Sequence, residues 1–219
     1  MPCHYGYLRP HTPPLDYEHH SVIIMGAGPT GLLLGLKFAQ QRIDVLFLEA
    51  EKEIATYRRA CLYMPIVLKE FEKVGLLDAV VKAGAINTEG MAFRTPLGKD
   101  NRLLGCLLQT QVPKDRDSDL NNMVVHVGQN ELAKIIQGMA EKYLHFQVRL
   151  SNRFTGCQQD EPGKVRVGVS TPKGEQFMEA DYVVGCDSGT SAVWRALCIP
   201  FQRFTWNDFR LIATNIRYP

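Results

Sequence analysis

The chain has 219 residues, of which 45% are hydrophobic and 22% are charged. This length favours one domain or one and a half, with enough apolar residues to form a sizeable core. The 25 basic and 23 acidic side chains leave a net charge of +2, so composition gives no electrostatic reason to expect binding to nucleic acid or to an anionic membrane. The longest apolar runs are interrupted by the glycines at 26–31 and fall short of the roughly 18 residues that a membrane span needs.

The first 20 residues are rich in proline and histidine and contain no apolar core. They match neither a secretory signal nor an Arg-rich transit peptide, so we expect a disordered tail over residues 1–20. The four histidines of this segment are irregularly spaced, which is typical of solvated side chains rather than of a metal site. The six cysteines of the chain form no C-x-x-C pair, which favours reduced thiols, no metal centre and a cytoplasmic location.

The first segment after this tail is predicted to form a βαβ unit. Residues 21–25 are an apolar run that indicates a strand buried on both faces, residues 29–41 have apolar side chains at helical spacing, and residues 43–48 predict a second buried strand. A second helix is predicted over residues 59–74, ended by Gly75 and followed by a further turn or two before Gly84.

Residues 89–127 have a different texture, because short strand-like pieces alternate with polar stretches, and we expect a β-rich insertion there. A helix is predicted over residues 129–143. Three short antiparallel strands and one buried strand are predicted next, at residues 146–153, 164–170, 175–179 and 181–185. A last helix is predicted over residues 190–197.

A glycine-rich turn joins the first predicted strand to the first predicted helix. Its residues follow the pattern G-x-G-x-x-G and are Gly26, Ala27, Gly28, Pro29, Thr30 and Gly31. In this pattern the first glycine permits a tight turn, the second lets a pyrophosphate approach the backbone, and the third lets the helix pack closely on the strand. The anion lies at the positive end of the helix. This strand–turn–helix context favours dinucleotide binding over a purely structural turn.

Two acidic residues stand at the ends of predicted strands. Glu49 ends the second strand, where a carboxylate can accept hydrogen bonds from an adenosine ribose, although by itself it could equally be a solvated glutamate. Asp187 follows the last buried strand and could bind a ribityl hydroxyl or cap the helix behind it. The β-rich insertion and the antiparallel strands interrupt the βα units that a nicotinamide dehydrogenase would continue, which points to FAD.

Four segments combine these features in a fixed order. They are residues 22–31 with Glu49, residues 59–65 with the helix that runs to Gly75, residues 128–132, and residues 182–187. In this order and spacing they resemble the FAD-dependent aromatic hydroxylases of the para-hydroxybenzoate hydroxylase and phenol hydroxylase type. The resemblance extends from Ser21 to the C-terminus.

The resemblance assigns roles to individual residues. It implies that the turn at residues 26–31 holds the FAD pyrophosphate, that Glu49 binds the ribose, and that Asp187 contacts the ribityl chain. It further implies that Arg59 reaches the pyrophosphate and that Gln129 lies beside the flavin. Arg59 could instead be an exposed cation at a helix start, and Gln129 an ordinary helix-start residue.

Three features depart from the family pattern. Ser188 stands where the family has a glycine after the aspartate, and Trp194 precedes Arg195, so that a family arginine is displaced. No second flavin motif of the Gly-Asp-Ala type follows Asp187. We therefore expect an N-terminal, truncated part of the family fold, in which the substrate region is begun but incomplete.

The sequence thus predicts an α/β fold, namely a Rossmann-like FAD-binding βαβ domain with an antiparallel three-stranded crossover and an incomplete β-rich substrate region. We expect the FAD-binding domain at residues 21–85 and 125–200. The partial substrate domain is expected at residues 86–124 and 201–219.

As the resemblance implies, the expected function is hydroxylation of a small phenolic substrate with FAD, O2 and either NADPH or NADH. Because the cofactor carries that chemistry, no catalytic residue is assigned. The expected partner is a small aromatic molecule, with no nucleic acid and no membrane, and a homo-oligomer or a completing chain is a further option. Two alternatives stay open: a non-catalytic nucleotide-binding remnant or module that needs a second chain, and a nicotinamide dehydrogenase.

Overall fold

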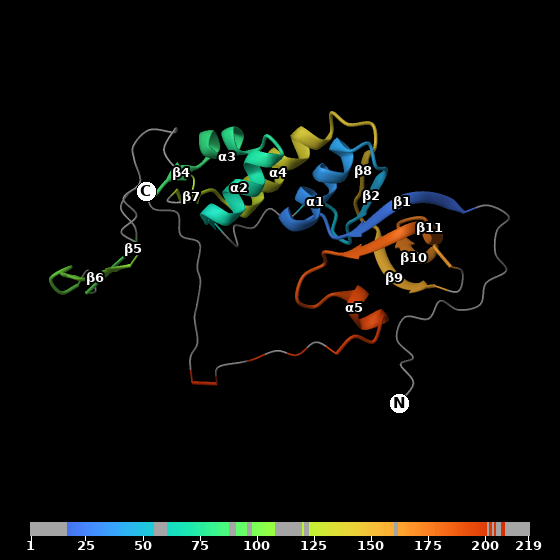
Figure 1. The fold of residues 1–219 in the computed structure, drawn as a ribbon. Helices are drawn as coiled ribbons and strands as arrows, with labels where there is room; N and C mark the ends of the chain where they lie inside the picture. The colour runs from blue at the N-terminus through green and yellow to red at the C-terminus, as the bar shows by residue number, and fades with distance from the viewer. Residues whose placement is uncertain are drawn as a thin grey trace. The chain divides into compact units, whose positions relative to one another are not determined.

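A computed structural model gives the fold (Figure 1). It describes residues 17–54, 61–87, 91–95, 98–107, 120, 123–159, 162–200, 202, 204, 207 and 208. The chain divides into two compact units, one formed by Met1–Arg58 together with Ala140–Pro219 and the other by Arg59–Met139.

The first unit is built on a six-stranded sheet in the order β8-β2-β1-β11-β10-β9. The strands are β1 (Glu18–Met25), β2 (Val45–Leu48), β8 (Phe146–Arg149), β9 (Arg153–Gln158), β10 (Val165–Thr171) and β11 (Gly174–Gly185). The first four strands in the sheet order run parallel, whereas β11, β10 and β9 pair antiparallel. The sheet therefore changes from parallel to antiparallel at β11.

Two strand boundaries differ from the sequence-based prediction. The predicted strands at 175–179 and 181–185 are one strand, β11, which pairs with both β1 and β10. The predicted strand at 146–153 is two strands, because a turn with Ser151 at φ 56° separates β8 from β9. β8 joins β2 in parallel register, and β9 is the outer antiparallel strand. The apolar and polar residues alternate over residues 146–151, and the polar residues Ser151, Asn152 and Arg153 then interrupt the pattern at the turn.

Helix α1 (Pro29–Gln40) contacts the parallel strands β1, β2 and β8. A Cβ atom on Gly35 would lie 2.2 Å from Cζ of Phe47, so this close approach of helix and strand requires glycine. The Phe47 ring packs in turn against Phe146 on β8, with ring centroids 4.9 Å apart and a tilted geometry that aromatic pairs favour. These contacts hold α1 against β2 and β8.

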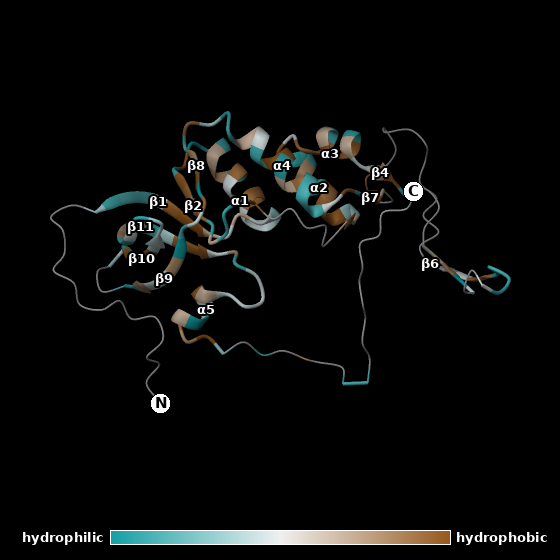
Figure 2. Ribbon diagram, turned by 180° about the vertical axis from the view of Figure 1, so that it is seen from behind, coloured by the Kyte–Doolittle hydropathy of each residue, from teal (hydrophilic) through white to brown (hydrophobic). Residues whose placement is uncertain are grey.

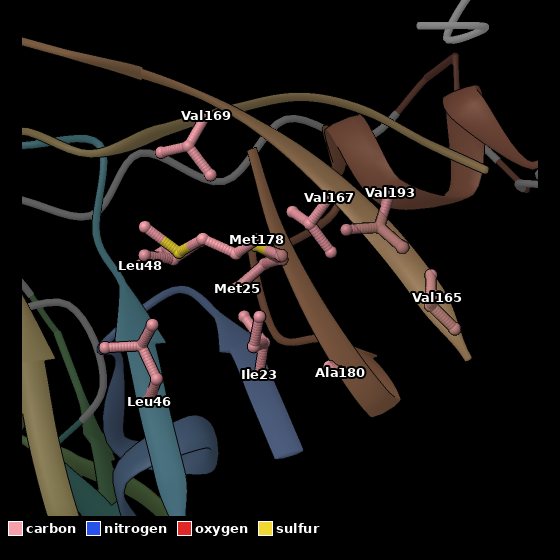
Figure 3. Close-up of a cluster of buried hydrophobic side chains, with 10 residues drawn as sticks. All are labelled: Ile23, Met25, Leu46, Leu48, Val165, Val167, Val169, Met178, Ala180 and Val193. Carbon is pink, nitrogen blue, oxygen red and sulfur yellow. The ribbon is translucent and has the colours of Figure 1, made fainter. Parts of the chain in front are cut away.

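The antiparallel strands cover the other face of β1 and β2. Figure 3 shows the side chains that pack together there, namely Ile23, Met25, Leu46, Leu48, Val165, Val167, Val169, Met178, Ala180 and Val193. They come from β1, β2, β10, β11 and helix α5 (Ala192–Ala196). Successive side chains of a strand point to opposite faces, and Ile23 and Ile24 are both 0% exposed. The predicted burial of the first strand on both faces is confirmed.

The first residues of β1 are polar, and Figure 2 shows the change from hydrophilic to hydrophobic along this strand. His20 is buried, with Nδ1 2.6 Å from Oδ2 of Asp44 and Nε2 3.2 Å from Oε1 of Glu18. Glu18 also accepts two hydrogen bonds from the Arg149 guanidinium, one of them 2.8 Å long. These side chains bridge from β1 to β8 across β2, which lies between them in the sheet. Residues 18–20 are therefore strand rather than disordered tail, and the expectation of a solvated His20 was wrong.

The second unit contains small sheets and three helices among its described residues. One sheet has the order β3-β7-β4, and a separate pair joins β5 to β6. The strands are β3 (Leu62–Tyr63), β4 (Ala85–Ile86), β5 (Met91–Arg94), β6 (Leu103–Leu107) and β7 (Val125–His126); the helices are α2 (Pro65–Lys73), α3 (Leu77–Ala83) and α4 (Gln129–Ala140). The helix predicted from residue 59 begins only at Pro65, because proline is preorganised for the first helical position and β3 precedes it.

Cysteine chemistry differs between positions. Cys61, Cys157 and Cys186 are free thiols. Cys198 is disulfide-bonded, so the expectation of reduced thiols was wrong for this residue.

Within the described part of the chain, no helix has the length and apolar character needed to cross a membrane. The same residues contain no cluster of three or more His, Cys, Asp or Glu side chains that could hold a metal ion.

The Glu18–Arg149 pair predicts a pH dependence of stability. The hydrogen bond from Arg149 is the main reason that the pKa of Glu18 is lowered from 4.5 to about 2. Because the folded chain holds this carboxylate ionised, its stabilising contribution is present above pH 4.5 and is lost as the pH falls toward 2. We expect Glu18→Gln to lower the free energy of unfolding at pH 7 by roughly 1 kcal/mol, since the pair is partly exposed.

Urea unfolding at several pH values between 7 and 2.5 measures this effect. The difference between wild type and Glu18→Gln should shrink below pH 4.5, whereas the exposed Glu53→Gln serves as a control with little effect at any pH. A constant difference across the whole range would contradict the role given to the Glu18 carboxylate.

Candidate functional site

The carboxyl ends of β1, β2 and β11 meet at one edge of the sheet in the first unit. The N–H of Gly26 donates to the carbonyl oxygen of Leu48 at 3.0 Å, and the N–H of Cys186 donates to that of Met25 at 2.8 Å. Ligands of open α/β sheets bind at the carboxyl ends of the strands. The glycine turn, Glu49 and Asp187 all lie at this edge, which makes it the candidate site.

Gly26 has a conformation and surroundings that exclude other residues. Its φ is +96°, which L-amino acids with a side chain rarely adopt. A Cβ at this position would lie 2.6 Å from the carbonyl oxygen of Cys186 and 3.2 Å from Cα of Asp187. The turn therefore passes directly against the end of β11, and the role predicted for the first glycine as the residue of the tight turn agrees with this geometry.

The other two glycines of the pattern have contrasting environments. A Cβ on Gly31 would lie 2.4 Å from the carbonyl oxygen of Gly26 and 3.2 Å from Cβ of Cys186, so Gly31 is needed for close packing of α1 on the strands. A Cβ on Gly28 would meet no described atom within 4 Å. The turn is thus filled at its first and third glycines and open at its second, where the pattern places a pyrophosphate.

The N-terminus of α1 adds donors to this open space. Gly28 is the N-cap, with φ −74° and ψ 170°, and makes no side-chain cap hydrogen bond, while Pro29 occupies the first helical position. The amides of Thr30 and Gly31 belong to the first turn and have no partner within the helix. Free N–H groups and the positive end of a 12-residue helix favour an anion here.

Glu49 follows β2 and faces the glycine turn. Its Oε2 accepts a hydrogen bond from the N–H of Ala27 at 2.8 Å, and its Oε1 accepts one from the N–H of Glu51 at 3.0 Å. The side chain is therefore held by the backbone on both oxygens. Each carboxylate oxygen has a second lone pair, so hydroxyl donors of a ligand can still be accepted.

Asp187 follows β11 and is partly engaged by helix α5. Its Oδ2 accepts a hydrogen bond from the N–H of Ala192 at 2.6 Å. Its Oδ1 is buried and has no hydrogen-bond partner among the described residues. The N-cap of α5 is Ser191, whose Oγ accepts from the N–H of Trp194, so Asp187 supports the helix start without being its cap. A buried acceptor without a donor costs folding free energy. A hydroxyl of a ligand that donates to Oδ1 of Asp187 would remove this cost.

Ser188 and Arg195, which both follow Asp187 in the chain, depart from the family pattern, and the structure shows the backbone conformation of the first and the contacts of the second. Ser188 has φ +74°, in the left-handed region that favours glycine. Arg195 donates from Nε to the carbonyl oxygen of Ser191 at 3.1 Å and from Nη2 to that of Thr190 at 2.9 Å. Its guanidinium is thus bonded to the loop that leads into its own helix.

Cys186 separates the glycine turn from Asp187. Burial raises the pKa of its thiol, and the negative charge of Asp187 adds to the shift. The thiol is therefore protonated at neutral pH, and Cys186 serves here as a small packing residue. Sequence reasoning missed how close it lies to the turn, because no local pattern links residue 186 to Gly26 and Gly31.

The structure does not unite all predicted site residues. Arg59 lies outside the described residues. Gln129 is the first residue of α4 in the second unit. Its neighbour Asn130, which sequence analysis did not single out, has a buried Oδ1 without a hydrogen-bond partner among the described residues. His126 on β7 bonds through Nε2 to Nδ2 of Asn87 at 3.0 Å.

Curated relatives of known activity are similar to most of this chain. A para-nitrophenol 4-monooxygenase from a Pseudomonas strain is 28% identical over 197 residues, which are 90% of this chain and 47% of the relative. A 6-hydroxy-3-succinoylpyridine 3-monooxygenase from Pseudomonas putida is 32% identical over 200 residues, again 90% of this chain and 48% of the relative. The chain thus spans about half the length of these relatives.

A solved structure and a family model point the same way. The crystal structure of p-nitrophenol 4-monooxygenase from Pseudomonas putida superposes with a TM-score of 0.74 at 25% identity, covering 86% of this chain and 46% of that one. The model of the FAD binding domain matches residues 19–218. Since that match extends over most of the sequence, the chain belongs to the FAD binding domain family.

Proposed function

We propose that the edge formed by the ends of β1, β2 and β11 holds FAD, with the pyrophosphate over residues 26–31. The observation that carries this proposal is the open space at Gly28, because the turn leaves room for a ligand only at the glycine where a pyrophosphate must approach. The free amides of Thr30 and Gly31 supply donors at that point. Ala27 and Pro29 complete the turn.

The two carboxylates fit the sugar portions of the same ligand. Glu49 lies beside the turn through its bond to Ala27, which suits contact with the adenosine ribose. The buried Oδ1 of Asp187 lacks a donor among the described residues, and a ribityl hydroxyl would supply one. A Cβ on Gly26 would lie 3.2 Å from Cα of Asp187, so the turn passes close to this residue. The ribose and ribityl contacts thus flank the pyrophosphate site, as FAD requires and a mononucleotide does not.

Further contacts remain predictions. Arg59 is proposed to reach the pyrophosphate and Gln129 to lie beside the flavin. The domain division rests on the sequence resemblance. We propose that the FAD-binding domain comprises residues 21–85 and 125–200, and that residues 86–124 and 201–219 belong to part of a substrate domain.

The proposed activity is that of the flavin-binding part of a monooxygenase that hydroxylates a small aromatic substrate. The relatives named above support this class of reaction, and FAD would supply the redox and oxygen chemistry with NADPH or NADH as reductant. The residues described here would bind and orient the cofactor. The alternative of a nucleotide-binding module without activity, completed by a second chain, predicts the same cofactor contacts but no product.

The cofactor site predicts opposite effects for two of its glycines. Gly28→Val fills the open space without meeting a described atom at Cβ, so it should leave the thermal midpoint nearly unchanged and abolish measurable FAD binding. Gly31→Ala places Cβ 2.4 Å from a backbone oxygen and should lower stability strongly, by roughly 2 kcal/mol or more. Calorimetric FAD titration and thermal unfolding of both variants separate the two effects.

Unchanged FAD affinity in a folded Gly28→Val variant would contradict the site. Equal thermal midpoints for Gly31→Ala and wild type would contradict the packing role of Gly31.

Ser188 predicts a stabilising substitution. Serine at φ +74° carries a cost of roughly 1 kcal/mol that glycine does not, so Ser188→Gly should raise the thermal midpoint. It should also raise the flavin occupancy of the purified chain, because the backbone that orients Asp187 is relieved of strain. Ser170→Gly in strand β10 is the matched control and should destabilise the chain. Lower flavin occupancy in Ser188→Gly, compared by absorbance on matched samples, would contradict this expectation.

The extent of this chain predicts poor coupling by the 219-residue polypeptide. It spans about half the length of the curated relatives, so we expect a flavin bound to it to be only partly enclosed by protein. Hydroxylation by a flavin needs a site from which water is excluded. We therefore expect the FAD-loaded chain to oxidise NADPH with release of peroxide and little hydroxylated phenol. Product in a 1:1 ratio to NADPH oxidised, measured by chromatography with p-nitrophenol as substrate, would contradict this prediction.

A further inference from the structure

Glu49 has a second role that does not depend on contact with a ribose. We propose that Glu49 is a positioning residue, whose carboxylate holds the glycine turn in its binding conformation before any ligand arrives. This inference rests on the proposed dinucleotide site and concerns how that site is kept in shape.

The contacts of the carboxylate carry the proposal. Oε2 of Glu49 accepts from the N–H of Ala27 at 2.8 Å, and Oε1 accepts from the N–H of Glu51 at 3.0 Å. Both oxygens therefore have backbone donors in the absence of a ligand. A carboxylate that served only as a ribose acceptor would not need a donor within the turn itself.

The backbone around Glu49 is fixed, so the carboxylate is a firm support. The N–H of Glu49 donates to the carbonyl oxygen of Arg149 at 3.0 Å, and the N–H of Asn152 donates to that of Glu49 at 2.8 Å. Two residues after Glu49, the carbonyl oxygen of Glu51 accepts a hydrogen bond from the N–H of Ser151 at 2.8 Å. These bonds join the end of β2 to the turn between β8 and β9 on the far side from β1.

Ala27 is the point where this support acts. It is 1% exposed and lies between Gly26, at φ +96°, and Gly28, where the open space begins. Without the carboxylate, its buried N–H would have no acceptor and little access to water, which costs free energy. Any rotation of this peptide moves Gly28 and changes where the first-turn amides of α1 point. The bond from Ala27 to Glu49 therefore fixes the orientation of the pyrophosphate site.

A comparison of two ligands separates positioning from ribose contact. Glu49→Gln removes the negative charge and puts an NH2 group in place of one carboxylate oxygen, so one of the two backbone N–H groups, of Ala27 or Glu51, faces a donor instead of an acceptor. If Glu49 positions the turn, this variant should weaken binding of ADP and of 2′,3′-dideoxy-ADP by similar factors, roughly tenfold, as expected for loss of a charge-assisted hydrogen bond. If Glu49 acts only on the ribose, the dideoxy ligand should bind variant and wild type equally.

The control variant is Glu51→Gln, which removes an exposed carboxylate two residues after Glu49 and leaves Glu49 in place. It should change neither affinity by more than about twofold, since surface charges have small effects. Calorimetric titration of wild type and both variants gives the six affinities needed. Equal dideoxy-ADP affinities for wild type and Glu49→Gln would overturn the positioning role.

A second measurement needs no ligand. Hydrogen exchange of the Ala27 amide in the ligand-free chain should be at least tenfold faster in Glu49→Gln than in wild type, with the Leu32 amide of α1 as an internal reference. Unchanged exchange at Ala27 would overturn the inference even if affinity falls. If wild type binds neither ADP nor FAD, the proposed dinucleotide site fails, and the exchange result still decides whether Glu49 holds the turn.

Discussion

The site depends on one close approach, that of the glycine turn to the end of β11. Gly26 lies so near Cys186 that a single methyl group there would meet the carbonyl oxygen of Cys186 at 2.6 Å. This contact brings together residues separated by some 160 positions in sequence and places Asp187 beside the turn. Gly31 extends the same contact, because its missing Cβ lets α1 approach both Gly26 and Cys186. The N-terminus of α1 can take this position because neither Gly26 nor Gly31 has a Cβ atom.

The curved sheet behind the site makes that approach possible. β1 and β11 are long strands that pair in parallel from Glu18 and Met178 to Met25 and Gly185. Their final residues form the site. The first half of β11 also pairs antiparallel with β10, and its side chains join the core on the face opposite α1. One strand pair thus supports both the ligand edge and the packed interior. The Glu18–Arg149 bonds tie the first residue of β1 to the last residue of β8.

Sequence reasoning located the turn, the two buried strands beside it and the acidic residues at their ends, because each follows from a local pattern. It could not join 175–179 to 181–185 as one strand, since Asp181 breaks the apolar run without breaking the backbone. It also placed the second helix too early, because apolar spacing from residue 59 outweighed the start signal of Pro65. The burial of His20 could not be predicted, because its bond to Asp44 joins residues 24 positions apart and no local pattern links them. Ser188 was identified from the motif alone, and its positive φ gives that departure a physical meaning.

The charges at the site pose a last question, because a pyrophosphate is an anion and the two nearest functional side chains are carboxylates. Each carboxylate accepts backbone N–H groups, from Ala27 and Glu51 for Glu49 and from Ala192 for Asp187, so part of its charge is already balanced. These bonds also fix the remaining lone pairs in directions suited to hydroxyl donors. Among the described residues, the proposed position of the anion is bordered by the open space at Gly28 and the positive end of α1. The helix N-terminus thus lies between two carboxylates, Glu49 and Asp187. This order suits a ligand with phosphates in its middle and a sugar or sugar alcohol on either side, as in FAD.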